Sequence, residues 1–295
     1  MKAFLDFRQK EHDPKYFMRS GAIAPNPEQP QRIDILRAGA TDAGCLFSQP
    51  TDMGIGHIAK IHSPQYLTFL ENIHKRWTRI PGGGEEVVPN IHPRARQDGY
   101  PRSAVGQAGY HQADTACPIA EHTWKSAYWS AQGALNGAAT ITDGNQNVYV
   151  LSRPPGHHAY ADQAGGFCFL NNSAIAAQYL LSKGMRPTIL DVDVHHGNGT
   201  QGIFYRRDDV LTVSLHADPE RFYPFFWGYE QEKGDGQGLG YNLNLPLPRG
   251  TGDDDFLIAL DIGLARARNF GSDVIVVALG LDASIDDPFE GLAIT

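Results

Sequence analysis

The sequence alternates short apolar runs with longer segments of helical periodicity, and this alternation is the feature that most limits its fold. Runs rich in β-branched residues predict buried strands at 147–153, 187–193, 210–216 and 273–282. Helical spacing of apolar residues predicts helices at 63–77, 123–141, 172–184 and 254–271. Strands and helices in alternation indicate an α/β fold in which helices cover both faces of a parallel sheet.

Local signals mark several ends of these elements. Ser63 is the expected N-cap of the helix at 63–77, with Pro64 at its first helical position. Gly184 and Gly271 are the expected C-terminal caps of two other helices. The stretch 80–110, rich in Gly, Pro and Arg, has no periodicity and is predicted as a long loop, which in a compact domain is usually functional or disordered.

Composition narrows the class of protein. A chain of 295 residues without a separate linker is consistent with a single α/β domain. No apolar run is long enough to span a bilayer, and the charged start does not match a secretory signal, so we expect a soluble cytoplasmic protein with no membrane partner. A net charge of −8 disfavours nucleic acid as a partner and mildly favours a cationic ligand. Three widely spaced cysteines argue against a disulfide framework.

Titratable side chains cluster where the predicted strands end. Residues two apart on a strand share a face, so Asp191, Asp193 and His195 are expected to project together. The other strand ends add His157 and His158, His216, and Asp282, Asp286 and Asp287. A single Asp or His at such a position is more often a turn former or a helix cap. Several together are harder to explain by packing, because each buried charge costs several kcal/mol unless it is paired or binds a metal.

One combination of these residues has the composition of a metal site. Asp193, His195 and Asp282 offer two carboxylate oxygens and one imidazole nitrogen. Catalytic zinc sites use three protein ligands of this kind and keep a fourth position for water or substrate. The same set also suits Fe(II), Mn(II) or Co(II), so the ligand types alone leave the metal open.

The order and content of these blocks resemble the histone deacetylase family, in its bacterial acetylpolyamine amidohydrolase branch. The matching segments are RPPGHHA, GGFCFLNN, LDVDVHHGNGTQGIF, VSLHAD and GLDASIDDPFEGL, with NPEQPQRI and KIHSPQYL nearer the N-terminus. The resemblance covers nearly the whole chain, and it implies one catalytic domain over 1–295. That domain would have the arginase/deacetylase-like three-layer fold, with a central parallel sheet. The implied activity is zinc-dependent hydrolysis that releases acetate from an acetylated amine.

The resemblance also implies roles for individual residues. Asp193, His195 and Asp282 match the zinc ligands, and His157 and His158 match the tandem catalytic histidines. Asp191 matches the partner of His157, and Asn198 stands where His158 has its partner. A carboxylate favours the charged form of an imidazole more strongly than an amide does. His158 is therefore the expected general base, while zinc polarises the acetyl carbonyl and acidifies the attacking water.

Further positions match the family's cation and substrate sites. Two structural potassium sites are implied. The nearer site comprises Asp191, Asp193, His195, Ser214 and Leu215, and the second comprises Phe204, Arg207, Val210 and Tyr241. Phe167 and Tyr223 match aromatic walls of the substrate channel, although ordinary core packing also explains a single aromatic residue. Asp114 falls near an acidic position that meets a distal ammonium group. The stretch 80–110 stands where the branch has an insertion that packs against a second subunit, so we expect a homodimer and a narrowed entrance.

One departure from the family leaves alternatives open. The family continues past the last ligand block with a Gly-Gly-Tyr segment whose tyrosine stabilises the oxyanion, and this sequence reaches Thr295 without it. We therefore expect that this sequence is cut short before the family's C-terminal segment; the alternative is a domain that lacks this segment and its oxyanion donor. The alternatives are a deacetylase of acetyl-lysine peptides, a binuclear manganese ureohydrolase of the arginase type, and a non-catalytic acyl-amine-binding relative.

Overall fold

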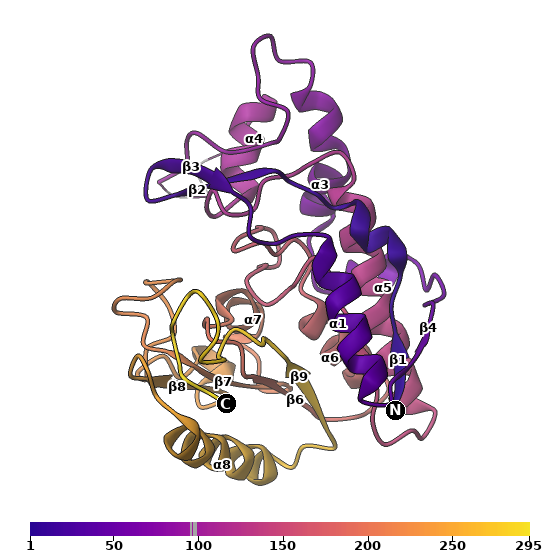
Figure 1. Cartoon of the computed structure of the whole chain (residues 1–295), viewed down its shortest axis with the longest axis vertical. Coiled ribbons are helices and arrows are strands. Elements are labelled where there is room, and N and C mark those ends of the chain that lie inside the picture. Colours follow the sequence, from indigo (N-terminus) through magenta and orange to yellow (C-terminus); the bar gives the residue numbers. More distant parts are fainter. Residues whose placement is uncertain (95, 97–98) are drawn as a thin grey trace. The chain divides into compact units, whose positions relative to one another are not determined.

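The computed structural model describes residues 1–94, 96 and 99–295, and it confirms the mixed α/β class with parallel sheets (Figure 1). Contacts along the chain divide it into two compact units, Met1–Ile175 and Ala176–Thr295. Each unit has its own parallel sheet. The assignment of 1–295 to a single catalytic domain stays a prediction.

The first unit is built on a three-stranded parallel sheet with the order β4-β1-β5. These strands are β1 (Lys2–Phe4), β4 (Leu46–Ser48) and β5 (Tyr149–Val150). The unit also contains a 3-10 turn η1 (Phe7–Glu11), the hairpin β2 (Tyr16–Arg19) and β3 (Ala22–Pro25), and the helices α1 (Gln31–Asp42), α2 (Ile55–Ile58), α3 (Pro64–Trp77), α4 (Ala104–His111) and α5 (Thr123–Thr142). The strand predicted at 147–153 is therefore only two residues long.

Two helices of this unit follow the sequence signals closely. The Ser63 side chain accepts a hydrogen bond from the backbone N–H of Tyr66, and Pro64 opens α3, as the capping pattern predicts. In α5, glycines replace larger residues on the side that faces β5. A Cβ at Gly137 would lie 2.6 Å from the Val150 side chain, so the helix can approach the strand this closely only with glycine there.

The stretch 80–110 is more regular than predicted, and the assignment of its end to a loop is wrong. Helix α4 begins after Ser103, whose side chain accepts a hydrogen bond from the Gly106 N–H. Its small residues hid the helical pattern, because they serve close packing. A Cβ at Gly109 would lie 1.7 Å from the Ile91 carbonyl oxygen. Residues 95, 97 and 98 of the predicted loop lie outside the described residues.

The second unit contains a four-stranded parallel sheet with the order β8-β7-β6-β9. Its strands are β6 (Pro187–Asp191), β7 (Leu211–Ala217), β8 (Asn242–Leu247) and β9 (Val274–Ala278). Three of them confirm the strands predicted at 187–193, 210–216 and 273–282. Strands β6 and β9 are shorter than predicted, and β7 is displaced by one residue. Strand β8 escaped prediction because its inward positions are polar. Asn242 and Asn244 are buried, whereas Leu243 between them is only partly buried.

Helices flank this sheet on both faces. Figure 1 shows α7 (Asn198–Phe204) on one face and α8 (Asp253–Phe270) on the other. Helix α6 (Asn172–Ser182) precedes β6 in the chain. Gly271 ends α8 in the left-handed conformation, with φ 76°, which confirms the predicted cap. A Cβ at Gly263 of α8 would lie 2.9 Å from Val213 of β7, so this helix also packs closely through a glycine.

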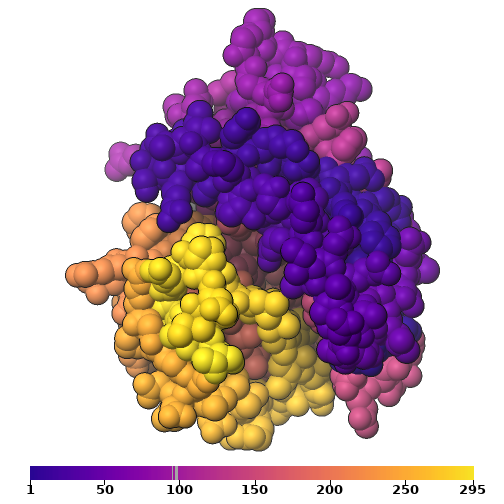
Figure 2. Space-filling model, viewed as in Figure 1, coloured from indigo at the N-terminus to yellow at the C-terminus, as the bar shows by residue number. Residues whose placement is uncertain are grey.

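The last residues of the chain pack on the second unit, as the yellow atoms in Figure 2 show. The backbone N–H of Ala293 donates to the Thr251 carbonyl oxygen, and that of Ile294 donates to the Ala283 carbonyl oxygen.

All three cysteines, Cys45, Cys117 and Cys168, are buried thiols. Among the described helices, none combines the length and apolar character that crossing a membrane requires.

Candidate metal centre and catalytic site

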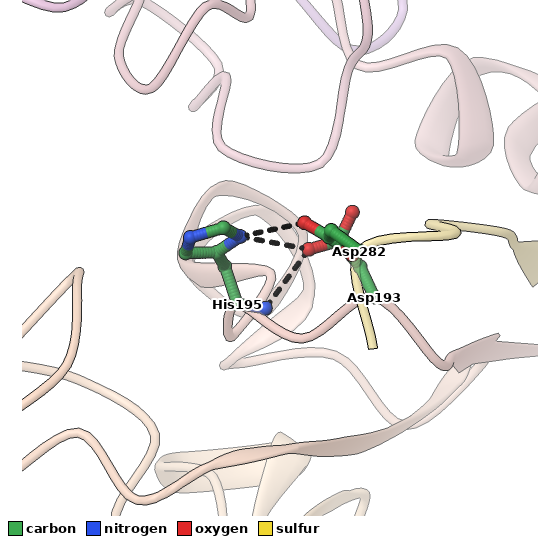
Figure 3. Close-up of side chains that lie close together, drawn as sticks. All are labelled: Asp193, His195 and Asp282. Carbon is green, nitrogen blue, oxygen red and sulfur yellow. Dashed lines mark hydrogen bonds and ion pairs between the residues drawn. The ribbon is translucent and has the colours of Figure 1, made fainter. Parts of the chain in front are cut away.

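Three side chains of the second unit converge at one end of its sheet. Asp193, His195 and Asp282 each offer one ligand atom, and these atoms lie within 4.8 Å of one another (Figure 3). The His195 Nδ1 atom lies 3.1 Å from Oδ1 of Asp193 and 3.0 Å from Oδ2 of Asp282. The structure therefore brings together the three residues that the sequence singled out as metal ligands.

Parallel pairing of β6 and β9 explains why residues so far apart in sequence meet. Asp191, the last residue of β6, pairs with Ala278, the last residue of β9, so both chains leave the sheet at the same edge. Beyond β6 the side chains keep alternating. Val194 is fully buried in the core, whereas Asp193 and His195 on either side of it face the site.

Backbone hydrogen bonds hold the ligand loop in shape. The N–H of Asp193 donates to Oδ1 of Asp191 over 3.1 Å, and the N–H of His195 donates to Oδ1 of Asp193 over 2.9 Å. The N–H of Val194 donates to Oδ1 of Asp282 over 3.0 Å. Each carboxylate is therefore oriented by a backbone amide of residues 193–195, which limits the freedom of the ligand atoms before any ion binds.

Gly280 is a requirement of the site that sequence reasoning missed. A Cβ at this position would lie 2.1 Å from Oδ2 of Asp193 and 2.6 Å from Oδ1 of Asp282. No side chain fits at those distances, so the two carboxylates approach each other only because residue 280 has none. The signal was present in the sequence as a glycine two residues before the last predicted ligand.

The electrostatics of the site favour a positive charge between its carboxylates. Burial alone lowers the pKa of His195, but hydrogen bonds and charge interactions with Asp193 and Asp282 outweigh it and raise that pKa to about 10. Burial and the charge of Asp193 raise the pKa of Asp282. Two partly buried carboxylates beside one imidazole form a donor set of oxygen and nitrogen atoms, and this set fits a divalent cation such as zinc.

Aromatic side chains surround the His195 ring. Phe222 stacks on it with ring centroids 5.0 Å apart, Phe289 meets it edge-on at 5.3 Å, and Tyr223 meets it edge-on at 6.0 Å. Tyr223 was predicted as a channel wall, whereas Phe222 and Phe289 were missed. Both lie within irregular loops, in the segments RFYPFF and IDDPFEG, so they gave no periodic signal in the sequence.

The tandem histidines lie in the first unit, in the turn that follows β5. His157 and His158 are buried, and their ring centroids are 4.0 Å apart. The turn is closely packed at Gly156, where a Cβ would lie 2.6 Å from the backbone nitrogen of Asn172. The Ser130 hydroxyl donates to the Pro154 carbonyl oxygen over 3.1 Å and so holds the start of the turn.

A buried ion pair anchors the chain just before these histidines, and sequence reasoning missed it. The Arg153 Nε atom donates to Oε1 of Glu28 over 2.8 Å, and each side chain is only 3% exposed. The Arg153 guanidinium also donates to the Gln9 carbonyl oxygen over 2.7 Å, and its backbone N–H donates to the Gln9 side chain over 2.7 Å. Burial raises the pKa of Glu28 and lowers the pKa of Arg153. Removing both charged groups from water therefore costs free energy, which their mutual attraction must offset.

The remaining predicted partners and cation positions lie in the second unit. Asp191 and Asn198 are both buried, and Asn198 is the first residue of α7. The positions predicted for potassium are Asp191, Asp193, His195, Ser214 and Leu215, and then Phe204, Arg207, Val210 and Tyr241. Ser214 lies opposite Asp191 in the pairing of β6 with β7. The carbonyl oxygens of Phe204 and Tyr241 accept hydrogen bonds from Arg207 and Thr212. These cation roles stay predictions.

The other predicted substrate positions lie in the first unit. Phe167 has a left-handed backbone, with φ 66°, and its ring lies 5.9 Å from that of Phe17. Oδ2 of Asp114 accepts a hydrogen bond from the Gly166 N–H over 3.1 Å, and Oδ1 accepts one from Ala116 over 2.8 Å. Asp114 thus supports the turn that carries Phe167, and its contact with a distal ammonium group stays a prediction.

The Asp-His-Asp set lies beyond the strand ends of a parallel α/β sheet, where hydrolases that use a metal ion can hold it. Similarity to known proteins identifies the family. The sequence pattern described as the histone deacetylase domain matches residues 26–295. The chain belongs to this family.

Relatives place the chain more closely within it. The acetylpolyamine amidohydrolase of Burkholderia pseudomallei is 46% identical over 288 residues, which are 97% of this chain and 84% of the relative. The enzyme of the same name from Mycoplana ramosa is 39% identical over 299 residues, covering 100% of this chain and 87% of the relative. The crystal structure of acetylpolyamine aminohydrolase from Burkholderia pseudomallei superposes with a TM-score of 0.97 at 45% identity, covering 100% of this chain and 86% of that one.

Proposed function

We propose that this chain is a zinc-dependent amide hydrolase that removes acetyl groups from acetylated polyamines or diamines. The observation that carries the proposal is the convergence of Asp193, His195 and Asp282 at one end of the sheet. Family membership supports deacetylation as the reaction, and the names of the similar relatives support an acetylated polyamine as the substrate.

The ligand set supports one divalent ion in the site. Zinc accepts two carboxylates and one imidazole and keeps a further coordination position, although Fe(II), Mn(II) and Co(II) accept the same ligands. When bound, the metal supplies a Lewis acid for the acetyl carbonyl and lowers the pKa of water. The set of three residues also favours an amide hydrolase with one metal ion over a binuclear manganese ureohydrolase, which needs additional bridging carboxylates. Potassium at the positions listed above is part of the same proposal.

The chain's own residues then handle the protons and the substrate. His158 takes a proton from the attacking water, and it returns a proton to the amine nitrogen as the carbon–nitrogen bond of the amide breaks. His157 next to it contributes positive charge. Asp191 and Asn198 orient this pair, and Phe167 and Tyr223 grip the alkyl chain. These roles rest on the resemblance of the motifs to the family.

Assembly and location complete the proposal. The stretch 80–110 forms contacts between the subunits of a homodimer and restricts the entrance, which favours a thin, flexible amine over a folded acetylated protein. The enzyme works in the cytoplasm. A net charge of −8 attracts a cationic substrate, and this attraction weakens as salt rises.

The direct test compares substrates and metal content in one preparation. Acetate release is measured with acetylputrescine, acetylspermidine and an acetyl-lysine peptide, and zinc per chain is measured by elemental analysis. We expect the small amines to be hydrolysed faster than the peptide, with activity lost on chelation and restored by zinc. Two metal ions per chain would favour a binuclear enzyme, and faster peptide hydrolysis would favour a protein deacetylase. Zinc binding without hydrolysis would favour a non-catalytic relative.

A further inference from the structure

A short loop beside the candidate metal centre exposes several aromatic side chains. We call residues 222–229, between β7 and β8, the aromatic loop. Phe226 is 75% exposed, Phe225 is 47% exposed and Trp227 is 39% exposed. Apolar rings exposed in such a group are unfavourable in water and commonly mark a surface that binds something.

The loop holds these rings in a defined arrangement. Phe225 has a left-handed backbone, with φ 64°, which is costly for a bulky residue and persists only where surrounding contacts impose it. Its N–H donates to the Phe222 carbonyl oxygen over 3.0 Å. The Tyr229 hydroxyl donates to the Phe225 carbonyl oxygen over 2.8 Å. The strain at Phe225 is therefore maintained by two hydrogen bonds within the loop.

Gly228 ties the end of the loop to the buried sheet. Its N–H donates to Oε2 of Glu232 over 2.9 Å, and its carbonyl oxygen lies 2.9 Å from Nε2 of the buried His216. A Cβ at Gly228 would lie 2.8 Å from the rings of both His196 and His216. The exposed aromatic residues thus stand on a rigid base, which is the arrangement expected of a preorganised binding surface.

A series of rings connects the loop to the metal centre. The His195 ring lies 6.0 Å from that of Tyr223, and the Tyr223 ring lies 6.3 Å from that of Phe225. Phe226 and Trp227, the next two residues of the chain, form a separate edge-to-face pair with centroids 5.8 Å apart. A ligand that reached His195 at one end and extended along the loop would therefore meet aromatic side chains outside the site.

The chemistry of the loop favours a cation. The faces of aromatic rings carry negative potential and attract ammonium groups, most strongly at Trp. The flanking sequence adds negative charge, because residues 218–232 contain four acidic residues and one arginine. An acetylated polyamine has this chemistry. Its amide end is neutral and its other end is an alkylammonium group.

We infer that the aromatic loop is a subsite for the distal ammonium group of the substrate, with Phe226 and Trp227 as its cation–π partners. This inference rests on the proposed function, because the acetyl group must lie at the metal centre for the other end to reach the loop. It assigns substrate specificity to side chains that take no part in bond breaking.

The test separates the charge-recognising role of the rings from their apolar surface. Trp227→Leu and Phe226→Leu remove the aromatic face and keep apolar bulk, whereas Trp227→Phe and Phe226→Tyr keep an aromatic ring. We measure kcat/KM with acetylspermidine and with a neutral N-alkylacetamide of equal length. In the Leu variants we expect kcat/KM for the cationic substrate to fall about fivefold to thirtyfold, with the neutral substrate changed less than about twofold. The aromatic variants should retain most of the activity. An equal fall for both substrates, or no fall for either, would overturn the inference.

A binding experiment keeps this inference distinct from the proposed function. Calorimetric titration of the zinc-loaded protein with free spermidine requires no turnover. We expect the parent protein and Trp227→Phe to bind spermidine, and Trp227→Leu to bind it several-fold more weakly. If the parent hydrolyses no acetylated amine yet shows this pattern, the proposed function fails and the cation subsite stands. If the parent hydrolyses acetylspermidine but binding is equal in all variants, the subsite is wrong and the function stands.

Discussion

The backbone N–H of Val194 donates a 3.0 Å hydrogen bond to Oδ1 of Asp282, a residue 88 positions later in the chain. This bond fixes one oxygen of the carboxylate and leaves Oδ2 facing Nδ1 of His195 at 3.0 Å. A fully buried residue of the core thus orients a ligand through its backbone amide.

This relationship predicts different effects for two changes at one position. Asp282→Asn keeps an acceptor for Val194 but removes the negative charge, so we expect zinc binding to weaken strongly while the fold is retained. Asp282→Ala removes both, and we expect it to lose zinc and also about 1 kcal/mol or more of stability. Zinc per chain after dialysis and urea unfolding measure the two effects. Stoichiometric zinc in either variant would contradict the ligand assignment.

Gly280→Ala is expected to abolish zinc retention and deacetylation although it replaces none of the proposed ligands. The added methyl group would occupy space within 2.1 Å of Oδ2 of Asp193, so the carboxylates must separate. Gly39→Ala is the matched control, since a Cβ there meets nothing within 4 Å in helix α1. We expect the control to be neutral or to stabilise the protein by up to about 1 kcal/mol. Unchanged zinc content in Gly280→Ala would show that the site tolerates a wider spacing.

The ion pair between Glu28 and Arg153 is expected to be important for the turn of the tandem histidines. Glu28→Gln leaves a buried guanidinium without its counter-charge, and we expect a loss of about 3–5 kcal/mol in the free energy of unfolding. Asp34→Asn, which breaks the exposed pair with Lys10, should cost less than about 1 kcal/mol. Chemical denaturation compares the two. Equal, small losses would show that Arg153 finds other partners.

The tandem histidines are expected to differ in their contributions to kcat. His158→Ala removes the proposed proton shuttle, so we expect a larger fall in kcat than for His157→Ala, which loses mainly positive charge. Zinc content serves as the control, because neither residue is a proposed ligand. The reverse ranking, with zinc bound in both variants, would exchange the two roles.

Buried histidines in the first unit predict a loss of stability in mild acid. Burial lowers the pKa of His62 and of His111 to about 4, below the ordinary value of 6.5. Well above pH 6.5 both histidines are neutral in the folded chain and in the unfolded chain. As the pH falls towards 4, the unfolded chain binds protons that the folded chain does not, and stability falls. The loss is on the order of 3 kcal/mol per histidine at pH 4.

Urea unfolding between pH 7 and pH 4 measures this dependence. The variant His111→Gln should show a smaller decrease in stability over this range than the parent protein, because one of the groups that bind protons on unfolding is gone. Identical pH profiles for the parent and the variant would contradict the assignment. His111 lies against Tyr100 and the Asp162 carbonyl oxygen, so stability at pH 7 must be compared first.

Local sequence patterns determined the class of the fold and most ligand candidates. Alternation along a strand depends only on neighbouring residues, so the shared face of Asp193 and His195 was visible from their spacing. The cap at Ser63 and the left-handed Gly271 were visible for the same reason. Relations of this kind are set by backbone geometry within a few residues.

Only the tertiary structure decided which distant groups come close together. The pairing of β6 with β9 carries Asp282 to His195, and only that approach makes Gly280 indispensable. Arg153 meets Glu28 because the chain between them folds back, and Asn244 is buried in β8, the strand that pairs with β7. Such contacts depend on packing and on the burial of polar groups. The contacts join residues dozens of positions apart, so no regular spacing in the sequence reveals them.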